Sequence, residues 1–167
     1  PISYIESFGI QALLLTNGND LFSVRERDHT EESLLRFAFK NKISVFGVCR
    51  GLQLINAYFD GKLVKELPRQ KHVAVDHSVT IVDSNVKEAL GVEKIIVNSY
   101  HNQGIHVETL SPVLKAFAVS DDGIVEGIYH PKAPIIGVQW HPERERKRNK
   151  LSQYVIQKWL STKREEQ

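Results

Sequence analysis

A single cysteine lies in a pentapeptide whose residue types suit a nucleophile. The segment Gly47–Gly51 reads Gly-Val-Cys-Arg-Gly, with glycine two positions to either side of Cys49. This matches the strand-to-helix elbow that raises a nucleophile above a sheet, and its glycines are needed because backbone segments come close together there. A helix that begins at the cysteine favours the thiolate through its dipole and its free N–H groups. The alternative is a buried structural cysteine beside two glycines.

A second segment offers the base that such a nucleophile needs. Residues Gly137–Glu143 read Gly-Val-Gln-Trp-His-Pro-Glu after an apolar run. In extended backbone His141 and Glu143 point the same way, and Pro142 keeps the chain out of a helix. A carboxylate beside an imidazole fixes its tautomer and stabilises the imidazolium. Alone, His-Pro-Glu also fits a surface or capping histidine; together with the elbow it indicates nucleophilic catalysis by cysteine.

The apolar patterns predict the elements that would position these residues. Residues 11–16 and 43–48 are expected as buried strands, and residues 2–8 and 51–59 as helices. Asp28 with Glu31 resembles a capping box at the start of a further helix. Alternating strands and helices favour an α/β fold with a parallel sheet. The rest of the chain is strand-rich: strands are predicted at 78–82, 95–97, 113–119, 124–130 and 135–140, a hairpin turn at 121–123, and a helix at 151–160.

Composition limits the class of protein. The chain has 167 residues, of which 41% are hydrophobic and 25% charged. These values fit one globular domain and exclude a disordered, collagen-like or disulfide-stapled chain. No apolar run approaches the ~20 residues that span a bilayer, and Pro1–Gly9 lacks the pattern of a signal peptide. We therefore expect a cytoplasmic protein that does not insert into a membrane.

The net charge of +2 is concentrated in one run. Residues Arg144–Lys150 contain five basic side chains and one acidic one, or +4, which leaves −2 for the remainder. A nucleic-acid binder more often spreads basic residues along a face with aromatics between them, so no nucleic-acid partner is expected. The run fits a solvated flank before the last helix. The alternative is a site that binds an anion or docks a partner.

Taken together, the motifs resemble the class I glutamine amidotransferase superfamily, and most closely its γ-glutamyl hydrolase branch, which includes γ-glutamyl-γ-aminobutyrate hydrolases. Gly-Val-Cys-Arg-Gly-Leu-Gln and Gly-Val-Gln-Trp-His-Pro-Glu carry the resemblance. The turn at 15–20, the segment at 97–104 that contains Asn-Ser-Tyr-His, and the closing strands at 124–127 and 135–143 extend it over nearly the whole chain. The resemblance implies a flavodoxin-like open, mostly parallel sheet with helices on both faces. It also implies one domain over residues 1–167 that lacks the first strand and helix usual in the superfamily.

The resemblance implies roles for particular residues. Cys49 is expected as the nucleophile, His141 as base and then acid, and Glu143 as the orienting carboxylate. The backbone N–H groups of Gly18 and Arg50 would form the oxyanion hole, because fixed donors suit the place where negative charge develops. Many relatives have Gly-Gly at this turn where this chain has Asn17-Gly18, and asparagine tolerates left-handed backbone better than most residues. The substrate would be held by four residues: Gln53, Ser99, Tyr100 and His101.

Purely structural roles remain possible for some of these residues. Gln53 also fits a plain helix residue, and His101 a structural hydrogen-bonding residue. The other histidines (29, 72, 77, 106 and 130) are expected at the surface or in hairpins. His72 and His77 suggest a metal pair, but no carboxylate or cysteine cluster completes a site in the sequence, so neither a metal nor a cofactor is expected.

Three functions remain open at this point. The first is a free-standing hydrolase that cleaves a γ-glutamyl amide through a cysteine thioester and releases glutamate and an amine. The second is a glutaminase subunit that supplies ammonia to a synthetase partner. The third is a non-catalytic binding module, which the presence of all three triad residue types argues against. A small γ-glutamyl substrate is the expected partner, with a homodimer or a synthetase as a further possibility.

Overall fold

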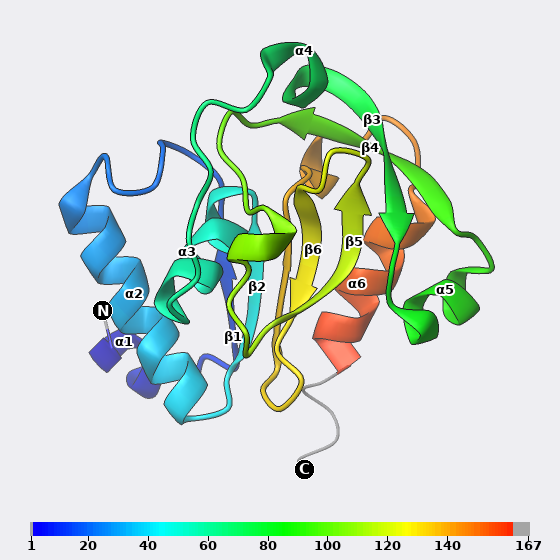
Figure 1. Ribbon diagram of the computed structural model, residues 1–167. Helices are drawn as coiled ribbons and strands as arrows, with labels where there is room; N and C mark the ends of the chain where they lie inside the picture. The colour runs from blue at the N-terminus through cyan, green and yellow to red at the C-terminus, as the bar shows by residue number, and fades with distance from the viewer. Residues whose placement is uncertain (1, 162–167) are drawn as a thin grey trace.

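The computed structural model describes residues 2–161, which form a central sheet covered by helices (Figure 1). The strands are β1 (Ala12–Leu15), β2 (Ser44–Val48), β3 (Val73–Ile81), β4 (Lys94–Tyr100), β5 (Lys115–Ser120), β6 (Val125–Tyr129) and β7 (Ile135–Val138). The helices are α1 (Ile2–Ser7), α2 (Arg25–Lys40), α3 (Arg50–Tyr58), α4 (Arg69–His72), α5 (Ser84–Leu90) and α6 (Lys150–Ser161), with 3₁₀ turns η1 (Val107–Thr109) and η2 (Pro142–Arg144).

The seven strands form one mixed sheet in the order β1-β2-β7-β6-β5-β3-β4. β1, β2 and β7 pair in parallel, whereas the other four pairs of neighbouring strands are antiparallel. The α/β class is confirmed, but the expected mostly parallel pairing is wrong for these residues. Short connections such as the turn at 121–123 can join only antiparallel strands, since a parallel crossover needs a dozen or more residues. The triad segments lie in the parallel part.

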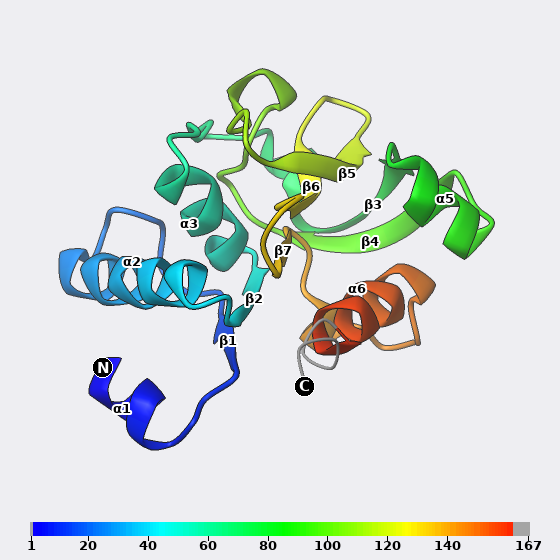
Figure 2. The ribbon, with the colours of Figure 1, turned by 90° about the horizontal axis from the view of Figure 1, so that it is seen from below.

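Helices cover both faces of the parallel strands (Figure 2). Helices α2 and α3 lie against one face, where Leu35, Leu52 and Ile55 pack on the inward side chains of β1, β2 and β7. Helix α6 covers the opposite face, where Leu151 and Val155 pack with residues of β2 and β7. Both faces of β2 are therefore apolar, as its uniformly buried residues indicate.

The expected helices and strands are present with shifted boundaries. The capping box expected at the start of one helix does not form. Helix α2 begins at Arg25, and its N-cap residue Val24 makes no side-chain cap bond. Asp28 and Glu31 therefore do not form the expected capping box; both side chains bind the guanidinium of Arg50 instead. Two helices, α4 and α5, were not expected, although α5 has a capping residue in Asp83. Within residues 2–161, no helix combines the length and apolar character needed to cross a bilayer.

Candidate active site

Cys49 lies at the junction of β2 and α3, at the carboxyl end of the parallel strands. Its backbone has φ 53° and ψ −102°, a strained conformation for a residue with a side chain. Its N–H donates to the carbonyl oxygen of Val138 on β7 at 2.7 Å, and the amide of Gln139 lies 3.4 Å from its Sγ. The strand–nucleophile–helix elbow predicted from the sequence is thus present in the structure.

The two glycines of the elbow are required by close packing. A Cβ atom at Gly51 would lie 2.2 Å from the carbonyl oxygen of Leu15 in β1. A Cβ atom at Gly47 would lie 2.7 Å from the backbone of Gly51 and from Ile55. Helix α3 therefore approaches the sheet at a distance that only glycine permits, which confirms the reason inferred for these residues.

The imidazole of His141 is held by Glu143 and by a residue with no predicted side-chain role. Nδ1 of His141 lies 2.8 Å from Oε1 of Glu143. Nδ2 of Asn17 donates to the same oxygen at 2.8 Å and lies 3.0 Å from Nδ1 of the histidine. The backbone reason given for the His–Glu pair is wrong, because Pro142 begins the 3₁₀ turn η2 instead of extended chain. The pair nevertheless forms, which leaves Nε2 of His141 for proton transfer.

The nucleophile and its base are not hydrogen-bonded in this conformation. Nε2 of His141 is buried and has no partner among the residues that the structure describes. Burial raises the pKa of Cys49 to about 12, against the opposing effect of the Arg50 backbone N–H. Burial also lowers the pKa of His141, although Glu143 acts in the opposite direction. Burial therefore favours a neutral thiol and a neutral imidazole, in opposition to the start of α3, which favours the thiolate.

One helix holds both parts of the expected oxyanion hole. From α2, Arg27 donates to the carbonyl oxygen of Asn17 at 2.9 Å and to Glu31 at 2.9 Å. Glu31 and Asp28 in turn bind the buried guanidinium of Arg50. We name this chain of contacts, formed by Arg27, Asp28, Glu31 and Arg50, the α2 clamp. It connects the turn at 17–19 with the first residue of α3.

The positive φ of Gly18 explains the glycine of the turn, and the residue packs against this clamp. Gly18 has φ 148°, and a Cβ atom there would lie 2.1 Å from Nη1 of Arg27. Asn17 is not among the residues with positive φ, so the tolerance of left-handed backbone expected of it is not used. Its side chain is used instead, through the contact with Glu143. Whether the N–H groups of Gly18 and Arg50 bind an oxyanion stays a proposal.

The four residues expected to bind substrate lie in different environments. Tyr100 is exposed, with its ring edge-on to the His141 imidazole at a centroid distance of 5.6 Å. Gln53 is buried and donates to the carbonyl oxygen of Gln103 and to Gln139 beneath Cys49. Ser99 is buried and donates to the carbonyl oxygen of His72, while His101 is buried against Glu126. Only Tyr100 presents an open surface beside the base.

Asn98 and Gln139 lie inside the quoted motifs but were given no role. The Asn98 amide donates to the carbonyl oxygen of His141 at 2.8 Å and accepts from its N–H at 2.9 Å. This reciprocal pair fixes the backbone that carries the base. Gln139 links Gln53 to Cys49. Their place in the motifs was the only sequence signal, because the contacts form between segments far apart in the chain.

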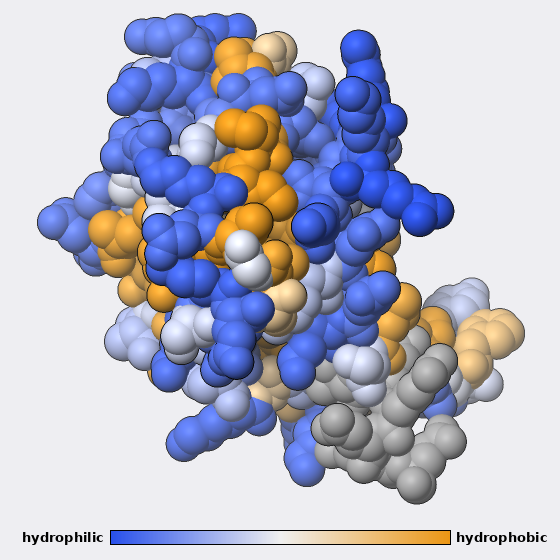
Figure 3. Space-filling view, turned by 90° about the vertical axis from the view of Figure 1, so that its right-hand side faces the viewer, coloured by the Kyte–Doolittle hydropathy of each residue, from blue (hydrophilic) through white to orange (hydrophobic). Residues whose placement is uncertain are grey.

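The basic run borders the site on the side of Tyr100. The guanidinium of Arg144 lies over the Tyr100 ring, 4.7 Å from its centroid. Residues 144–149 line a hollow of about 590 Å³ together with Tyr100 and Ile96. Figure 3 views this side of the molecule, where a stripe of hydrophobic surface lies among strongly hydrophilic side chains. The hollow itself places Ile96 and Val97 beside the basic side chains of the run.

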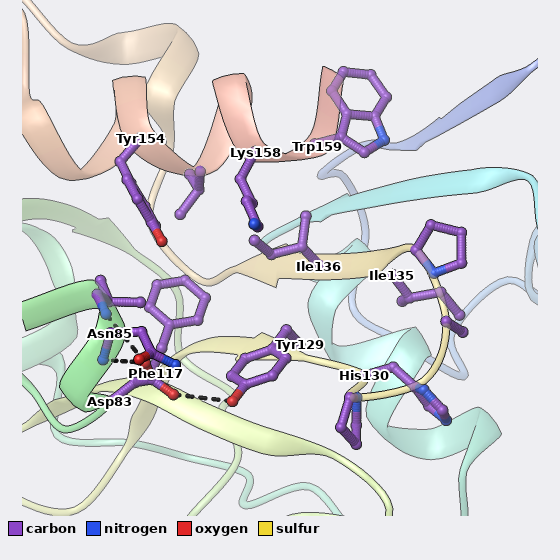
Figure 4. Close-up of a pocket in the computed structure, with 15 residues that line it drawn as sticks. Asp83, Asn85, Phe117, Tyr129, His130, Ile135, Ile136, Tyr154, Lys158 and Trp159 are labelled. Atoms are coloured by element: carbon purple, nitrogen blue, oxygen red, sulfur yellow. Dashed lines mark hydrogen bonds between the residues drawn. The ribbon is translucent and has the colours of Figure 1, made fainter. Parts of the chain in front are cut away.

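A separate cavity of about 310 Å³ lies away from the triad, between α6 and the strands β6 and β7 (Figure 4). It is lined by Tyr129, Ile135 and Trp159, and Asp83 accepts a hydrogen bond from the Tyr129 hydroxyl at 2.9 Å. Ile135 begins β7, so this cavity lies at the amino end of a parallel strand. Catalytic sites in such sheets lie at the carboxyl ends, where Cys49 is found.

Of the histidines expected at the surface or in hairpins, His72 is buried and His77 is partly buried in β3. His72 has no exposed surface, and His77 is only slightly exposed; both lie close to His101 and Glu126. Burial would raise the pKa of Glu126, but the imidazoles of His101 and His77 lower it to about 2. The expectation that no carboxylate accompanies this histidine pair is wrong, because Glu126 comes from a strand remote in sequence. One ligand atom from each of His72, His101 and Glu126 lies within 4.8 Å of the others.

Comparison with known proteins agrees with this geometry. The sequence profile of the family described as Peptidase C26 matches residues 16–143, a span that contains the elbow and the His-Pro-Glu segment. The chain belongs to the peptidase C26 family. The resemblance inferred from the motifs is thereby confirmed, and a chain of this family is expected to be an enzyme.

Three relatives illustrate the similarity. A protein of Schizosaccharomyces pombe that carries a glutamine amidotransferase name is 40% identical over 149 residues (80% of this chain, 58% of the relative). The γ-glutamyl-CDP-amidate hydrolase of Campylobacter jejuni is 30% identical (96% and 78%), and the γ-glutamyl-γ-aminobutyrate hydrolase PuuD of Escherichia coli is 32% identical (87% and 63%). The chain thus spans less than two thirds of the first and the third of these relatives.

Solved structures show the same fold. The glutaminase domain of Trypanosoma brucei CTPS with bound acivicin aligns with a TM-score of 0.74 at 15% identity, covering 99% of this chain and 76% of that one. A glutamine amidotransferase from Thermotoga maritima aligns with a TM-score of 0.67 at 14% identity, covering 93% and 63%. At these identities the alignments establish a glutamine amidotransferase fold and nothing finer.

Proposed function

We propose that the protein hydrolyses a γ-glutamyl amide bond through a thioester on Cys49. The observation that carries the proposal is the strained elbow cysteine at the end of β2, beside a His141–Glu143 pair that follows the adjacent parallel strand β7. We further propose that these three parallel strands belong to a flavodoxin-like open sheet. Membership of the peptidase C26 family and the names of two relatives support the γ-glutamyl specificity.

The first half of the reaction forms the thioester. Sγ of Cys49 attacks the carbonyl carbon of the γ-glutamyl amide while Nε2 of His141 takes the thiol proton. A neutral imidazole suits this step, and Glu143 stabilises the imidazolium that results. The C–N bond of the tetrahedral intermediate then breaks, and His141 gives its proton to the leaving amine. The amine departs and a glutamyl thioester remains.

The second half regenerates the enzyme. A water molecule attacks the thioester carbonyl while His141 takes one of its protons. The C–S bond breaks, the proton returns to sulfur, and glutamate leaves. In both halves negative charge develops on the carbonyl oxygen, for which the backbone N–H groups of Gly18 and Arg50 are the proposed donors. Loss of one such donor costs roughly 3 kcal/mol in comparable enzymes.

Asn17 is a positioning residue in this proposal. Its amide holds Glu143, which is 49% exposed, against the imidazole. Without this contact the carboxylate would rotate into solvent and His141 would lose its orientation. The Gly-Gly turn that the resemblance leads one to expect has no side chain for this task.

A hydrolase is favoured over a glutaminase subunit because the relatives whose names state a substrate are γ-glutamyl hydrolases. The hollow beside Tyr100 supports an anionic leaving group, since four basic side chains from residues 144–148 line it against two acidic ones, Asp76 and Glu145. A nucleotide-linked amidate fits this charge better than an uncharged amine does. The leaving amine would extend from His141 across Tyr100 toward this hollow.

The decisive experiment measures glutamate release by the protein alone. Glutamine, γ-glutamyl-γ-aminobutyrate and γ-glutamyl-CDP-amidate serve as substrates, and a Cys49→Ala variant is the control. We expect turnover of a γ-glutamyl amine without a second protein, no turnover by the variant, and a trapped glutamyl adduct on Cys49 by mass spectrometry. Activity on glutamine alone, and only with a synthetase present, would contradict the hydrolase. Full activity of the variant would refute the mechanism.

A further inference from the structure

Three histidines and one glutamate form a buried cluster that the proposed reaction does not use. We name it the Glu126 cluster: His72 at the end of α4, His77 in β3, His101 after β4, and Glu126 in β6. His72 and Glu126 have no exposed surface, and His101 is 4% exposed. The His72 ring lies 5.0 Å from the His101 ring and 5.3 Å from the His77 ring, measured between centroids. Four such groups rarely share a buried site without a partner that satisfies them.

In His72 and in His101, one ring nitrogen is hydrogen-bonded and the other has no hydrogen-bond partner among the described residues. Nδ1 of His101 donates to the carbonyl oxygen of Gln103 at 2.9 Å, so Nε2 carries a lone pair. Nε2 of His72 lies 3.0 Å from the Asp122 carboxylate, so it carries the proton and Nδ1 is the free nitrogen. Carbonyl and carboxylate acceptors of this kind fix the tautomer of metal-binding histidines. Among the described residues, these free nitrogens and both oxygens of Glu126 have no hydrogen-bond partner.

Distances within the cluster fit a shared ion better than direct hydrogen bonds. Oε1 of Glu126 lies 3.4 Å from Nε2 of His77 and 3.5 Å from Nε2 of His101. N–H···O bonds are usually about 2.7–3.2 Å long. Ligands about 2.0–2.2 Å from a tetrahedral Zn²⁺ are separated by about 3.3–3.6 Å. We propose that the cluster is a Zn²⁺ site with His72, His101 and Glu126 as ligands. His77, beside Glu126, supports this carboxylate from outside the ligand set.

A hollow beside the cluster gives the ion a route of entry, and hydrogen bonds connect the cluster to Cys49. A hollow of about 490 Å³ opens beside the cluster, lined by His72, His77 and Asp122. On the other side, Gln103 accepts from His101 and from Gln53, which reaches Cys49 through Gln139. An ion that fixes His101 therefore also stabilises the hydrogen-bonded residues that contact Cys49.

The test measures metal binding without reference to activity. The whole chain is freed of metal by chelation and then titrated with ZnCl₂, with bound zinc determined by mass spectrometry of the element. We expect one Zn²⁺ per chain and a melting temperature several degrees higher with the ion, because a ligand of the folded state stabilises it. Co²⁺ in the same site should give the strong visible absorption of tetrahedral coordination.

Two variants and one control decide the outcome. Glu126→Gln should lose stoichiometric binding, whereas the exposed His29→Ala should retain it. If Glu126→Gln does not fold, His77→Gln, at a less buried position, should lower zinc affinity at least tenfold. The proposal is overturned if the wild-type chain binds no zinc, or if the zinc it binds persists in the cluster variants. In that event the cluster is an imidazolium–carboxylate network held by protons alone.

Discussion

Replacing Asn17 tests whether a side chain outside the triad orients it. The Asn17 amide donates to Glu143 at 2.8 Å, and a hydrogen bond to a charged group contributes about 1.5–3 kcal/mol. Because Glu143 is half exposed, water replaces part of this bond, and the lower end of the range applies. Since about 1.4 kcal/mol is a factor of ten in rate, Asn17→Ala should lower kcat about tenfold. KM should change little, because Asn17 positions the base and does not hold substrate.

The pH profile separates orientation from general damage. In Asn17→Asp a second carboxylate lies beside Nδ1 of His141, stabilises the imidazolium, and raises the pKa of the base. Protonated His141 cannot accept the thiol proton, so the acidic limb of kcat/KM should move to higher pH in Asn17→Asp and not in Asn17→Ala. Asn41→Ala is the control, because Asn41 is exposed and its side chain bonds only the Phe37 carbonyl oxygen at the far end of α2. Unchanged kcat in Asn17→Ala, or an equal loss in the control, would refute the reasoning.

Three further predictions address the nucleophile, the α2 clamp and the basic run. Because burial raises the pKa of Cys49 to about 12, alkylation by iodoacetamide should be slow at pH 7 and still rise above pH 9; a plateau below pH 8 would show a resting thiolate. Arg50→Met leaves two carboxylates without their buried partner and should lower the free energy of unfolding by about 3–5 kcal/mol in urea, whereas Arg36→Met, at an exposed pair, should cost under about 1 kcal/mol. Equal costs would contradict the clamp. Arg146→Glu with Arg148→Glu should raise KM for an anionic γ-glutamyl amidate and leave KM for an uncharged amide unchanged; equal effects on both substrates would count against the hollow as the leaving-group site.

The elbow could be predicted from neighbouring residues in the sequence. Features that depend on contacts between distant segments could not. Gly47, Cys49 and Gly51 specify a strand-to-helix turn, because the two glycines permit the close backbone packing that the turn needs. This pattern can be recognised from the residue types and their spacing alone. Asp28 and Glu31 have the spacing of a capping box, but α2 begins earlier, with Val24 at its N-cap, and both carboxylates bind the buried guanidinium of Arg50.

The Glu126 cluster could not be predicted from the sequence for the same reason. His72 and His77 are separated by about fifty residues from Glu126, and the strand order β6-β5-β3 brings these parts of the chain together. Asn17 was noted for its backbone, yet its role arises from a contact with Glu143, 126 positions away. Sequence spacing reports such contacts only when both partners lie in one element.

The α2 clamp separates two properties that enzymes usually change together. Helix α2 contributes no group to the proposed chemistry, yet its side chains hold the turn at 17–19 on one side and Arg50 on the other. The spacing between the two proposed oxyanion donors is then set by a rigid helix and not by two independent loops. Substitutions on α2 can therefore tune the rate of bond cleavage while the surface that selects the leaving amine stays the same. Turnover and substrate choice can evolve independently on this scaffold.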